Sequence, residues 1–283
     1  MSAVLAIDHL CAELTADGTR LLSNISISVA AGKVHGLVGM SGAGKSMIAK
    51  AVLGVLPPAV RVTSGSIRFC GTEIIGLSRL GMRELLARGI ALIPQDPLTA
   101  LNPTRRIEAQ MTDVMRARLG LDAKAARMRA LMLLEEVQIR EPGSVLRRYP
   151  HEISGGQRQR VLIAIAFACN PKLIIADEPT TALDVTVQKQ ILRLIHDLRS
   201  KHGTAILLVT HDLGVVAKIC DSLSVMHAGV VVEQGVVGDI IQSPAHPFTR
   251  ALFAATPRHD RPGHELRPVP EALLRDVVEV SHR

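Results

Sequence analysis

Apolar positions near the start of the chain come in short groups that turn signals separate. Between residues 5 and 38 these groups are broken by Asp-Gly and Ala-Gly pairs, which predicts several strands leading into a loop. The apolar segments 173–176 and 205–209 predict two further strands, and a helical pattern over residues 185–198 lies between them. Strand, helix and strand in this order favour a parallel sheet covered by helices, with ligands at the carboxyl ends of its strands.

The amino-acid composition changes in the middle of the chain and again near its end. Residues 107–137 are charged, rich in Ala, Leu and Met and poor in helix breakers, which predicts a separate helical lobe. From residue 243 the chain is rich in Pro, His and Arg, and we expect an extension with one short helix over residues 271–280. The expected division is a main domain over residues 1–242, with the helical lobe inserted at about 96–165, and a C-terminal extension over 243–283.

Composition narrows the class of protein without deciding it. The 283 residues are 47% hydrophobic but only 2% aromatic, so the core is expected to be aliphatic. The longest apolar run, residues 161–169, is about half of the roughly 18 residues of a membrane span, and we expect no secretion signal. The four cysteines are scattered without a C-x-x-C pair, which favours a reduced, cytosolic compartment. The net charge of +7 suits nucleic acid, anionic lipid or phosphate ligands and does not choose between them.

A glycine-rich loop follows the expected strand at residues 34–38. It fits the pattern G-x-x-x-x-G-K-[ST] at every fixed position and reads Gly39-Met40-Ser41-Gly42-Ala43-Gly44-Lys45-Ser46. Glycines allow backbone N–H groups to curl around phosphates, and the helix that follows presents its positive N-terminal end. We expect Lys45 to reach the β- and γ-phosphates of a nucleotide and the Ser46 hydroxyl to ligate Mg²⁺. An incidental glycine-rich turn is disfavoured because the strand and the helix are both in place.

Two adjacent carboxylates end the expected strand at residues 173–176. We expect Asp177 to hold Mg²⁺, usually through water, and Glu178 to orient and polarise an attacking water molecule. Consecutive residues that leave a strand point in different directions, so the two side chains can take these two roles. Alone, the pair would be an ordinary acidic strand end, but beside a phosphate loop it indicates nucleotide hydrolysis.

Four further motifs occur in a fixed order around these two. Residues 153–157 read Ile-Ser-Gly-Gly-Gln, Gln95 follows an apolar strand, residues 182–184 read Ala-Leu-Asp, and His211 follows another apolar strand. Together with the phosphate loop and the acidic pair, these motifs resemble those of the ABC ATPases over nearly the whole chain. The signature sequence of that family is L-S-G-G-Q, and its Q-loop, D-loop and switch histidine correspond here to Gln95, Asp184 and His211.

The resemblance implies an α/β fold, with a P-loop NTPase (RecA-like) core, an antiparallel β subdomain and an inserted α-helical subdomain. Residues 1–242 would then be an ABC nucleotide-binding domain. Two ATP molecules would lie between two subunits arranged head to tail, and His211 would contact the γ-phosphate and the attacking water. Gln95 would sense the γ-phosphate and Mg²⁺, and Asp184 would link the two sites. The signature residues facing the γ-phosphate bound by the partner subunit would be Ser154, Gly155, Gly156 and Gln157.

Two segments resemble one branch of this family, the importers of oligopeptides, dipeptides and nickel. They are residues 94–103, around Gln95, and the run His-Pro-Phe-Thr-Arg-Ala-Leu at residues 246–252. The resemblance implies an ATPase that powers uptake of peptides or nickel complexes at the cytoplasmic face of a bacterial inner membrane. Its partners would be a second ABC ATPase subunit, identical or different, two integral-membrane permeases and, indirectly, an extracytoplasmic solute-binding protein. No nucleic acid partner is expected.

Three features of the chain bear on that interpretation. Most ABC ATPases stack an aromatic residue on adenine near the end of the first strand, but residues 13–16 contain none. Nucleotide affinity is therefore reduced, or aliphatic contacts hold the base instead. Some nickel-importer ATPases also lack this aromatic, so the resemblance is slightly closer to them. The C-terminal tail has no cysteine, so no iron–sulfur cluster is expected. Four histidines lack the helical spacing and the carboxylates of a nickel site, namely His246, His259, His264 and His282.

An alternative function is that of a soluble ABC-type ATPase acting on nucleic acid or ribosomes, which the positive charge would suit. Ribosome-acting relatives generally carry two nucleotide domains in one chain, and DNA-repair relatives insert long coiled coils. This chain shows neither feature. A regulatory subunit without turnover would need a damaged Glu178 or His211, and both residues are in place.

Overall fold

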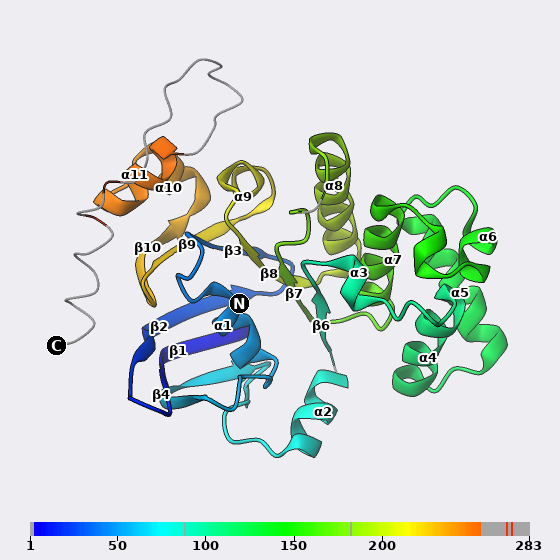
Figure 1. Cartoon of the computed structure of the whole chain (residues 1–283), viewed down its shortest axis with the longest axis horizontal. Coiled ribbons are helices and arrows are strands. Elements are labelled where there is room, and N and C mark those ends of the chain that lie inside the picture. The colour runs from blue at the N-terminus through cyan, green and yellow to red at the C-terminus, as the bar shows by residue number, and fades with distance from the viewer. Residues whose placement is uncertain (1–2, 88, 182, 256–269, 271–272, 274–283) are drawn as a thin grey trace. The chain divides into compact units, whose positions relative to one another are not determined.

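The computed structural model of the chain describes residues 3–87, 89–181, 183–255, 270 and 273. The chain forms two compact units, and Figure 1 labels most of their helices and strands. The first unit is built from Met1–Met82 and Ala205–Arg283, and the second from Arg83–Thr204. The second unit is therefore an insertion in the sequence of the first, and α2 (Arg79–Ala87) contains the first sequence boundary between them.

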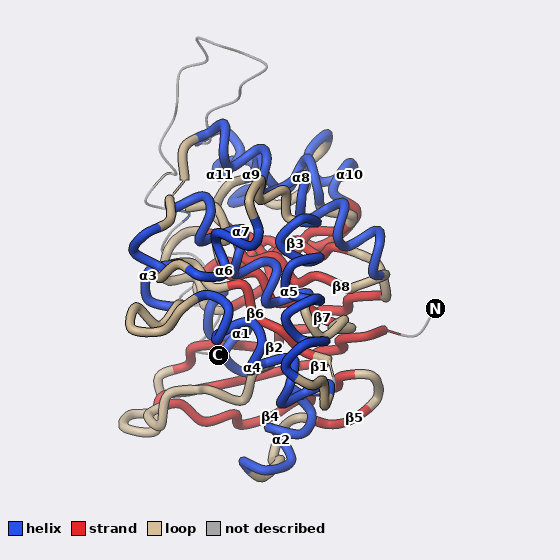
Figure 2. The backbone as a smooth tube through the Cα atoms, turned by 90° about the vertical axis from the view of Figure 1, so that its right-hand side faces the viewer, coloured by secondary structure: helices blue, strands red, loops and turns tan. Residues whose placement is uncertain are grey.

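The first unit contains a four-stranded antiparallel sheet in the order β2-β1-β4-β5 (Figure 2). Its strands are β1 (Ala3–Leu14), β2 (Arg20–Ala30), β4 (Val60–Phe69) and β5 (Thr72–Glu73). Ile7 of β1 pairs with Ile27 on one side and with Ile67 on the other. All three side chains are buried, because alternate positions of each strand face the core. The sheet confirms the early strands and the antiparallel β subdomain predicted from the sequence.

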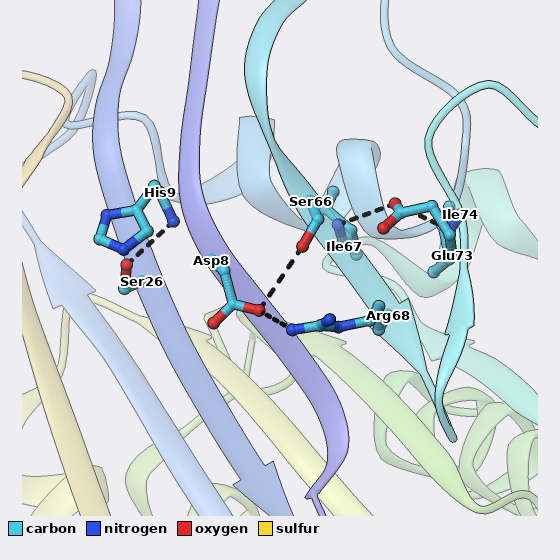
Figure 3. A network of polar contacts seen from close by, with 8 residues as sticks. All are labelled: Asp8, His9, Ser26, Ser66, Ile67, Arg68, Glu73 and Ile74. Atoms are coloured by element: carbon cyan, nitrogen blue, oxygen red, sulfur yellow. Dashed lines mark hydrogen bonds and ion pairs between the residues drawn. The ribbon is translucent and has the colours of Figure 1, made fainter.

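Polar contacts between β1, β2 and β4 fix how these strands align (Figure 3). Asp8 on β1 accepts hydrogen bonds from Arg68 and, at 3.5 Å, from the Ser66 hydroxyl, both on β4. On the other side, the His9 backbone N–H donates to Ser26 Oγ of β2 at 3.0 Å. Cross-strand pairs contribute roughly 0.2–1 kcal/mol each. A slip of one residue would break these contacts and turn the apolar face of the strand outward.

The remaining strands of the first unit surround β3 and follow each other in the order β10-β9-β3-β8. They are β3 (Val34–Gly39), β8 (Ala205–Thr210), β9 (Ser222–His227) and β10 (Val230–Val236). β3 is parallel to β8 and β9, and β10 is antiparallel to β9. Every residue of β3 and β8 is buried, which is typical of parallel strands covered by helices. The helices that lie wholly within this unit are α1 (Lys45–Val52), α9 (Leu213–Ile219), α10 (Val237–Gln242) and α11 (Pro247–Ala255).

A buried histidine of β3 bonds to β9. The ring nitrogens Nδ1 and Nε2 of His35 lie 2.7 and 2.8 Å from the hydroxyl oxygens of Ser222 and Ser224. The side chain is 1% exposed, and burial lowers the pKa of His35 from 6.5 to about 4. The ring is therefore neutral at pH 7, with one nitrogen donating and the other accepting a hydrogen bond.

The C-terminal helices of the first unit pack on its sheet. Figure 1 shows α10 and α11, in orange, beside β9 and β10. Phe248 of α11 is fully buried in a cluster that also contains Val225 of β9 and Val237 of α10. The helix predicted over residues 271–280 lies outside the described residues, except for position 273.

The second unit contains two parallel strands and the helical lobe. The strands are β6 (Ile90–Ile93) and β7 (Leu173–Asp177). The helices are α3 (Pro97–Ala100), α4 (Ile107–Leu119), α5 (Ala123–Glu136), α6 (Pro142–Arg147), a 3-10 turn (Pro150–Glu152), α7 (Gly155–Phe167) and α8 (Val185–His202). α4, α5 and α7 contact one another, and α6 contacts α4 and α5, so these helices form a group of the kind predicted for the helical subdomain.

The boundaries of these helices refine the predicted ones. The helical pattern over residues 107–137 is divided into α4 and α5, because Gly120 adopts a left-handed φ of +66° and ends α4. The helix predicted over residues 185–198 continues to His202 and ends at Gly203, which has a φ of +65°. Within the ranges that the structure describes, no helix is both long and apolar enough to cross a membrane.

Candidate active site

The phosphate loop joins β3 to α1 in the first unit. A Cβ atom at Gly39 would lie 2.3 Å from the carbonyl oxygen of Met226 on β9, so the backbone approach there requires glycine. Gly44 precedes α1 with a φ of +98°, a conformation that residues with a side chain rarely adopt. The two glycines that the motif fixes thus follow from close packing and from backbone conformation.

Lys45 and Ser46 form the first turn of α1. The Lys45 ammonium donates hydrogen bonds to the carbonyl oxygens of Gly39 at 2.8 Å and of Met40 at 2.9 Å. The positive charge is thereby held across the loop, close to the backbone N–H groups at the helix start, and Ser46 is exposed in the same turn. A cation beside a helix N-terminus is suited to binding phosphate.

β8 brings His211 to the same edge of the sheet as the phosphate loop. β3 and β8 are parallel, and Val38 is aligned with Thr210. The two strands therefore end at the same level. The phosphate loop (residues 39–44) follows the end of β3, and the exposed His211 follows the end of β8 directly beside it. Asp212, the next residue, caps α9 by accepting hydrogen bonds from two of its backbone N–H groups at 2.8 and 3.2 Å. This cap fixes the backbone that carries His211.

In the second unit, Gln95 and Glu178 contact each other. Ile93 of β6 is aligned with Ala176 of β7, so Gln95 and Glu178, each two positions further on, lie at the same edge of the sheet. Gln95 Nε2 donates a hydrogen bond to Glu178 Oε2 at 3.0 Å, and Thr181 Oγ1 donates to the same oxygen at 3.0 Å. Two donors thus orient a carboxylate, as expected for a group that receives a proton from water.

The backbone of Glu178 is in the left-handed region, with a φ of +46°. This conformation costs roughly 1–2 kcal/mol for a residue with a side chain. Glu178 directly follows Asp177, the last residue of β7, so the strained residue turns the chain where the strand ends. Strained residues persist where their surroundings hold them, and they cluster at active sites.

The signature residues form the start of α7. Ser154 is the N-cap, and its hydroxyl oxygen accepts a hydrogen bond from the Gln157 backbone N–H at 3.2 Å. In return, Gln157 Oε1 accepts from the Ser154 backbone N–H at 3.0 Å, which completes a capping box. The Ser154 hydroxyl accepts in this cap and retains its own hydrogen to donate to a ligand. Gly155 and Gly156 leave the first turn of a 13-residue helix without side chains, which suits an anion.

Sequence reasoning missed two residues that hold Glu178 and its neighbour in place. One is Thr181, which bonds Glu178 directly. The other is Gln159 of α7, which is 1% exposed and donates from Nε2 to the Pro179 carbonyl oxygen at 2.7 Å. Gln159 lies between Arg158 and Arg160 in the sequence, so no local pattern indicated that it would be buried or would bond a residue 20 positions further on.

Asp184 caps α8. Its Oδ1 atom accepts hydrogen bonds from the backbone N–H groups of Thr186 at 3.0 Å and Val187 at 2.9 Å. Among the D-loop residues, Ala182 lies outside the described residues. The structure thus gives Asp184 a capping role, and its link between two nucleotide sites stays a prediction.

The region expected to hold adenine lies at the end of β1. Glu13 forms an ion pair with Arg61 at 2.6 Å, and Thr15 Oγ1 donates to the Ala59 carbonyl oxygen at 3.2 Å. Between these two residues, Leu14 is half-buried and is the one large apolar side chain of residues 13–16. It is therefore the aliphatic group available to contact the base.

The histidines of the C-terminal tail are only partly covered by the structure. His246 Nδ1 accepts a hydrogen bond from the Phe248 backbone N–H at 3.1 Å, so it serves as a local cap at the start of α11. The other three lie outside the described residues, namely His259, His264 and His282. Among the residues that the structure does describe, no group of three His, Cys, Asp or Glu side chains could hold a metal ion.

Two family models match the chain. The model described as ABC transporter matches residues 22–181, more than half of the chain. The model described as oligopeptide/dipeptide transporter, C-terminal region, matches residues 232–279. These two matches cover the phosphate loop, the signature helix, the acidic pair and the segment around α11.

Curated relatives are similar to this chain along most of their own length. The probable D,D-dipeptide transport ATP-binding protein DdpD of Escherichia coli is 47% identical over 250 residues, covering 88% of this chain and 76% of the relative. The dipeptide transport ATP-binding protein DppD of Bacillus subtilis is 42% identical over 272 residues, covering 95% and 81%. The oligopeptide transport ATP-binding protein OppD of Salmonella typhimurium is 44% identical over 257 residues, covering 90% and 76%.

Solved structures agree with the expected fold. The cbiO1 subunit of Clostridium perfringens, part of the ABC transporter complex cbiONQ, has a TM-score of 0.75 at 28% identity, covering 86% of this chain and 92% of that chain. A dimeric ATP-binding cassette bound to ADP and Pi has a TM-score of 0.72 at 24% identity, covering 82% and 98%, and shows the fold alone. The predicted P-loop NTPase core is confirmed. With a family model over more than half of its length and relatives at 42–47% identity, this chain belongs to the ABC transporter family, as an ATPase subunit whose hydrolysis is coupled to transport.

Proposed function

We propose that this chain hydrolyses Mg²⁺-ATP with Glu178 as the residue that polarises the attacking water. The observation that carries this proposal is the pair of hydrogen bonds that Gln95 and Thr181 donate to Glu178 Oε2. A carboxylate held in one orientation can accept a proton at a defined place, which contributes roughly 10²–10⁴-fold to the rate.

The other groups of the reaction are assigned by their chemistry. Residues 39–46 hold the phosphates, and Lys45 stabilises the charge that develops on the transferred phosphoryl group. Mg²⁺ prefers hard oxygen ligands, and the chain offers the Ser46 hydroxyl, the Asp177 carboxylate and the Gln95 amide oxygen. Because Gln95 uses Nε2 to bind Glu178, its Oε1 atom remains an acceptor for the ion. When bound, Mg²⁺ neutralises part of the phosphate charge.

A second ATPase subunit, identical or different, completes each nucleotide site in this proposal. The N-terminus of α7, from Ser154 to Gln157, supplies hydrogen-bond donors to a γ-phosphate held by the partner. His211 contacts the γ-phosphate and the attacking water, and Asp184 links the two sites. The nucleotide-binding domain spans residues 1–242, with its helical subdomain at about 96–165, and the extension spans 243–283. Support for the extension comes from the family match to residues 232–279.

Peptides are the cargo class that we propose. The three curated relatives are named for transport of D,D-dipeptides, dipeptides and oligopeptides, and the C-terminal family match has the same description. These relatives favour peptides over nickel complexes, and transport over action on nucleic acid or ribosomes. The ATPase would work with two integral-membrane permeases at the cytoplasmic face of a bacterial inner membrane, fed by a solute-binding protein. We place the permease contact in the residues that follow Gln95, and Leu98 of α3, which is 60% exposed, lies in this segment.

Co-purification followed by an activity assay tests this function. A tagged chain carrying Glu178→Gln is recovered from membranes of the native host in the presence of ATP, and we expect two permeases and a second ATPase to accompany it. The wild-type complex is then placed in lipid vesicles with its binding protein, and ATP hydrolysis is measured with dipeptides, longer peptides or Ni²⁺. Lys45→Ala serves as the inactive control.

Stimulation of hydrolysis by peptides supports the proposal. Stimulation by Ni²⁺ alone would replace peptides with nickel as cargo and leave the ATPase assignment standing. Recovery of ribosomes or nucleic acid without any permease would overturn the transport function.

A further inference from the structure

The C-terminal segment contacts the part of the first unit that supports the phosphate loop. We propose that Phe248 of α11 is a positioning residue for ATP binding, because it holds His227 and the β9–β10 turn against the phosphate loop. This inference rests on the proposed nucleotide site at residues 39–46. In this proposal, α11 and the residues just before it contribute to nucleotide affinity.

A ring stack joins α11 to the end of β9. The ring of Phe248 is fully buried, and its centroid lies 4.1 Å from that of His227, with 28° between the ring planes. His227 is the last residue of β9 and is itself 7% exposed. Such ring pairs contribute about 0.5–1.5 kcal/mol beyond the burial of their surface. The stack therefore restricts the place of His227.

Glu233 of β10 fixes the chain just before α11. Its two carboxylate oxygens accept hydrogen bonds from the backbone N–H groups of Ala245 at 2.8 Å and His246 at 3.0 Å. Arg250, one turn into the helix, donates to the carbonyl oxygens of Pro244 at 3.0 Å and Ala245 at 2.7 Å. These hydrogen bonds hold the segment that carries Phe248, so the position of the Phe248 ring beside His227 is fixed.

The turn that follows His227 is strained. His227 pairs with Val230, which leaves Ala228 and Gly229 as the two residues of the β9–β10 turn. Both have positive φ angles, +45° and +79°, as in a type I′ hairpin turn. Glycine adopts this conformation readily, but alanine costs roughly 1–2 kcal/mol. A strained turn persists when its surroundings hold it, and the stack of Phe248 on His227 is one such restraint.

The same turn and strand contact the phosphate loop on both sides of His227. The Gly229 backbone N–H donates a hydrogen bond to the Ala43 carbonyl oxygen at 3.2 Å. On the other side, Met226 pairs with Gly39, and its Cε atom lies 3.4 Å from where a Cβ atom of Gly44 would be. A movement of His227 therefore moves groups that touch the loop at three positions. Misplacement by about 1 Å can cost up to about 10²-fold in an active site.

The test compares two phenylalanines of α11 in the full chain. Phe248→Leu keeps an apolar side chain but removes the ring stacked on His227. Phe253→Leu removes a ring from the same helix and the same buried cluster, and it is the matched control. The Kd of a fluorescent ATP analogue, mant-ATP, is measured together with kcat and KM for ATP.

We expect Phe248→Leu to raise the Kd of mant-ATP and the KM for ATP about 3–10-fold, which corresponds to the loss of one ring pair. The kcat at saturating ATP should change less than about threefold, because the hydrolysing carboxylate is untouched. Phe253→Leu should change Kd and KM less than about twofold. Thermal unfolding of each variant shows how much stability is lost, so that binding is measured where all variants are folded.

A second pair of variants separates positioning from packing. His227→Phe keeps a ring and should retain the wild-type Kd, whereas His227→Leu should raise it as Phe248→Leu does. If the two α11 variants affect the Kd equally, or neither affects it, Phe248 only packs the core and the positioning role is wrong. Lys45→Ala tests the nucleotide site itself. Binding by wild type but not by Lys45→Ala upholds that site whatever Phe248 does, and failure of wild type to bind overturns both proposals.

Discussion

Gln95 Nε2 donates a hydrogen bond to Glu178 Oε2 at 3.0 Å, although 83 residues separate them in the sequence. The parallel register of β6 and β7 makes the contact possible, because it brings the residues after both strands to one edge. The bond leaves Gln95 Oε1 as an acceptor, so one amide can contact both an ion and the Glu178 carboxylate. A displacement of Gln95 on nucleotide binding would therefore change the orientation of Glu178.

Replacement of Glu178 by Gln tests the water-polarising role. Glu178→Gln keeps an oxygen that Gln95 and Thr181 can bond but cannot accept a proton at neutral pH. We expect kcat to fall at least about 100-fold, with the Kd for ATP within about threefold of wild type. Hydrolysis is measured by phosphate release, and ATP-induced dimers of the variant are detected by gel filtration.

The matched control is Thr181→Val, which removes one of the two bonds to Glu178 and leaves the carboxylate in place. We expect an intermediate decrease in kcat of about 3–10-fold, since a neutral hydrogen bond contributes about 0.5–1.5 kcal/mol. Wild-type turnover in Glu178→Gln would show that another group activates the water.

Gln159 is predicted to tie the signature helix to the turn after β7. Gln159→Leu leaves the Pro179 carbonyl oxygen without its donor, and a buried acceptor left unpaired costs roughly 1–3 kcal/mol. We expect lower stability and a decrease in kcat of about 10-fold or more, because Pro179 directly follows Glu178. Urea unfolding and ATP hydrolysis are measured side by side.

The control for this variant is Val161→Ala, which opens a small cavity in the same helix at a fully buried position. It should lose stability but keep its kcat. Equal losses of kcat in Gln159→Leu and Val161→Ala would mean that stability alone explains both.

Local patterns in the sequence predicted much of the fold and most of the candidate site. The apolar segments at 173–176 and 205–209 correspond to β7 and β8, and the fixed spacing of the phosphate loop indicated how β3 meets α1. These features depend on residues that are neighbours in sequence, such as Gly44 before a helix. The description of the chain as an ABC ATPase depended on the order of several such local motifs.

Contacts between residues that are far apart in the sequence could not be predicted from local patterns. Nothing in the spacing of α7 showed that Gln159 would bond Pro179, and nothing in the C-terminal run showed that Phe248 would stack on His227. The left-handed conformation of Glu178 was also unpredictable, since glutamate has no preference for it. Such features are set by tertiary packing, and they occur here beside the residues assigned to ATP binding and hydrolysis.

An aromatic residue introduced at Leu14 is predicted to raise nucleotide affinity. Leu14 lies two residues after Ala12, whose partner Leu22 on β2 is 2.9 Å from where a Cβ atom of Gly44 would be. The end of β1 is thus close to the phosphate loop within the first unit. Stacking on a base contributes roughly 1–3 kcal/mol, so Leu14→Phe should lower the Kd for ATP at least about fivefold.

The control is Leu14→Ile, which adds no ring and should leave the Kd for ATP unchanged. Equilibrium binding of ATP is measured by calorimetry for both variants. A similar Kd for Leu14→Phe and wild type would show that adenine does not contact this position.

Stability is predicted to fall in mild acid because of His35. Its pKa is about 4 in the folded chain and 6.5 for an exposed histidine, so the unfolded chain binds more protons between these values. The contribution of His35 is therefore complete above pH 6.5 and declines as pH falls towards 4, by about 3 kcal/mol in total. Between pH 7 and pH 5 the loss is about 2 kcal/mol. Urea unfolding at both pH values should show this loss in wild type and a smaller one in His35→Gln, whose amide is neutral throughout. An equal pH dependence in the two proteins would mean that His35 is not the group that titrates.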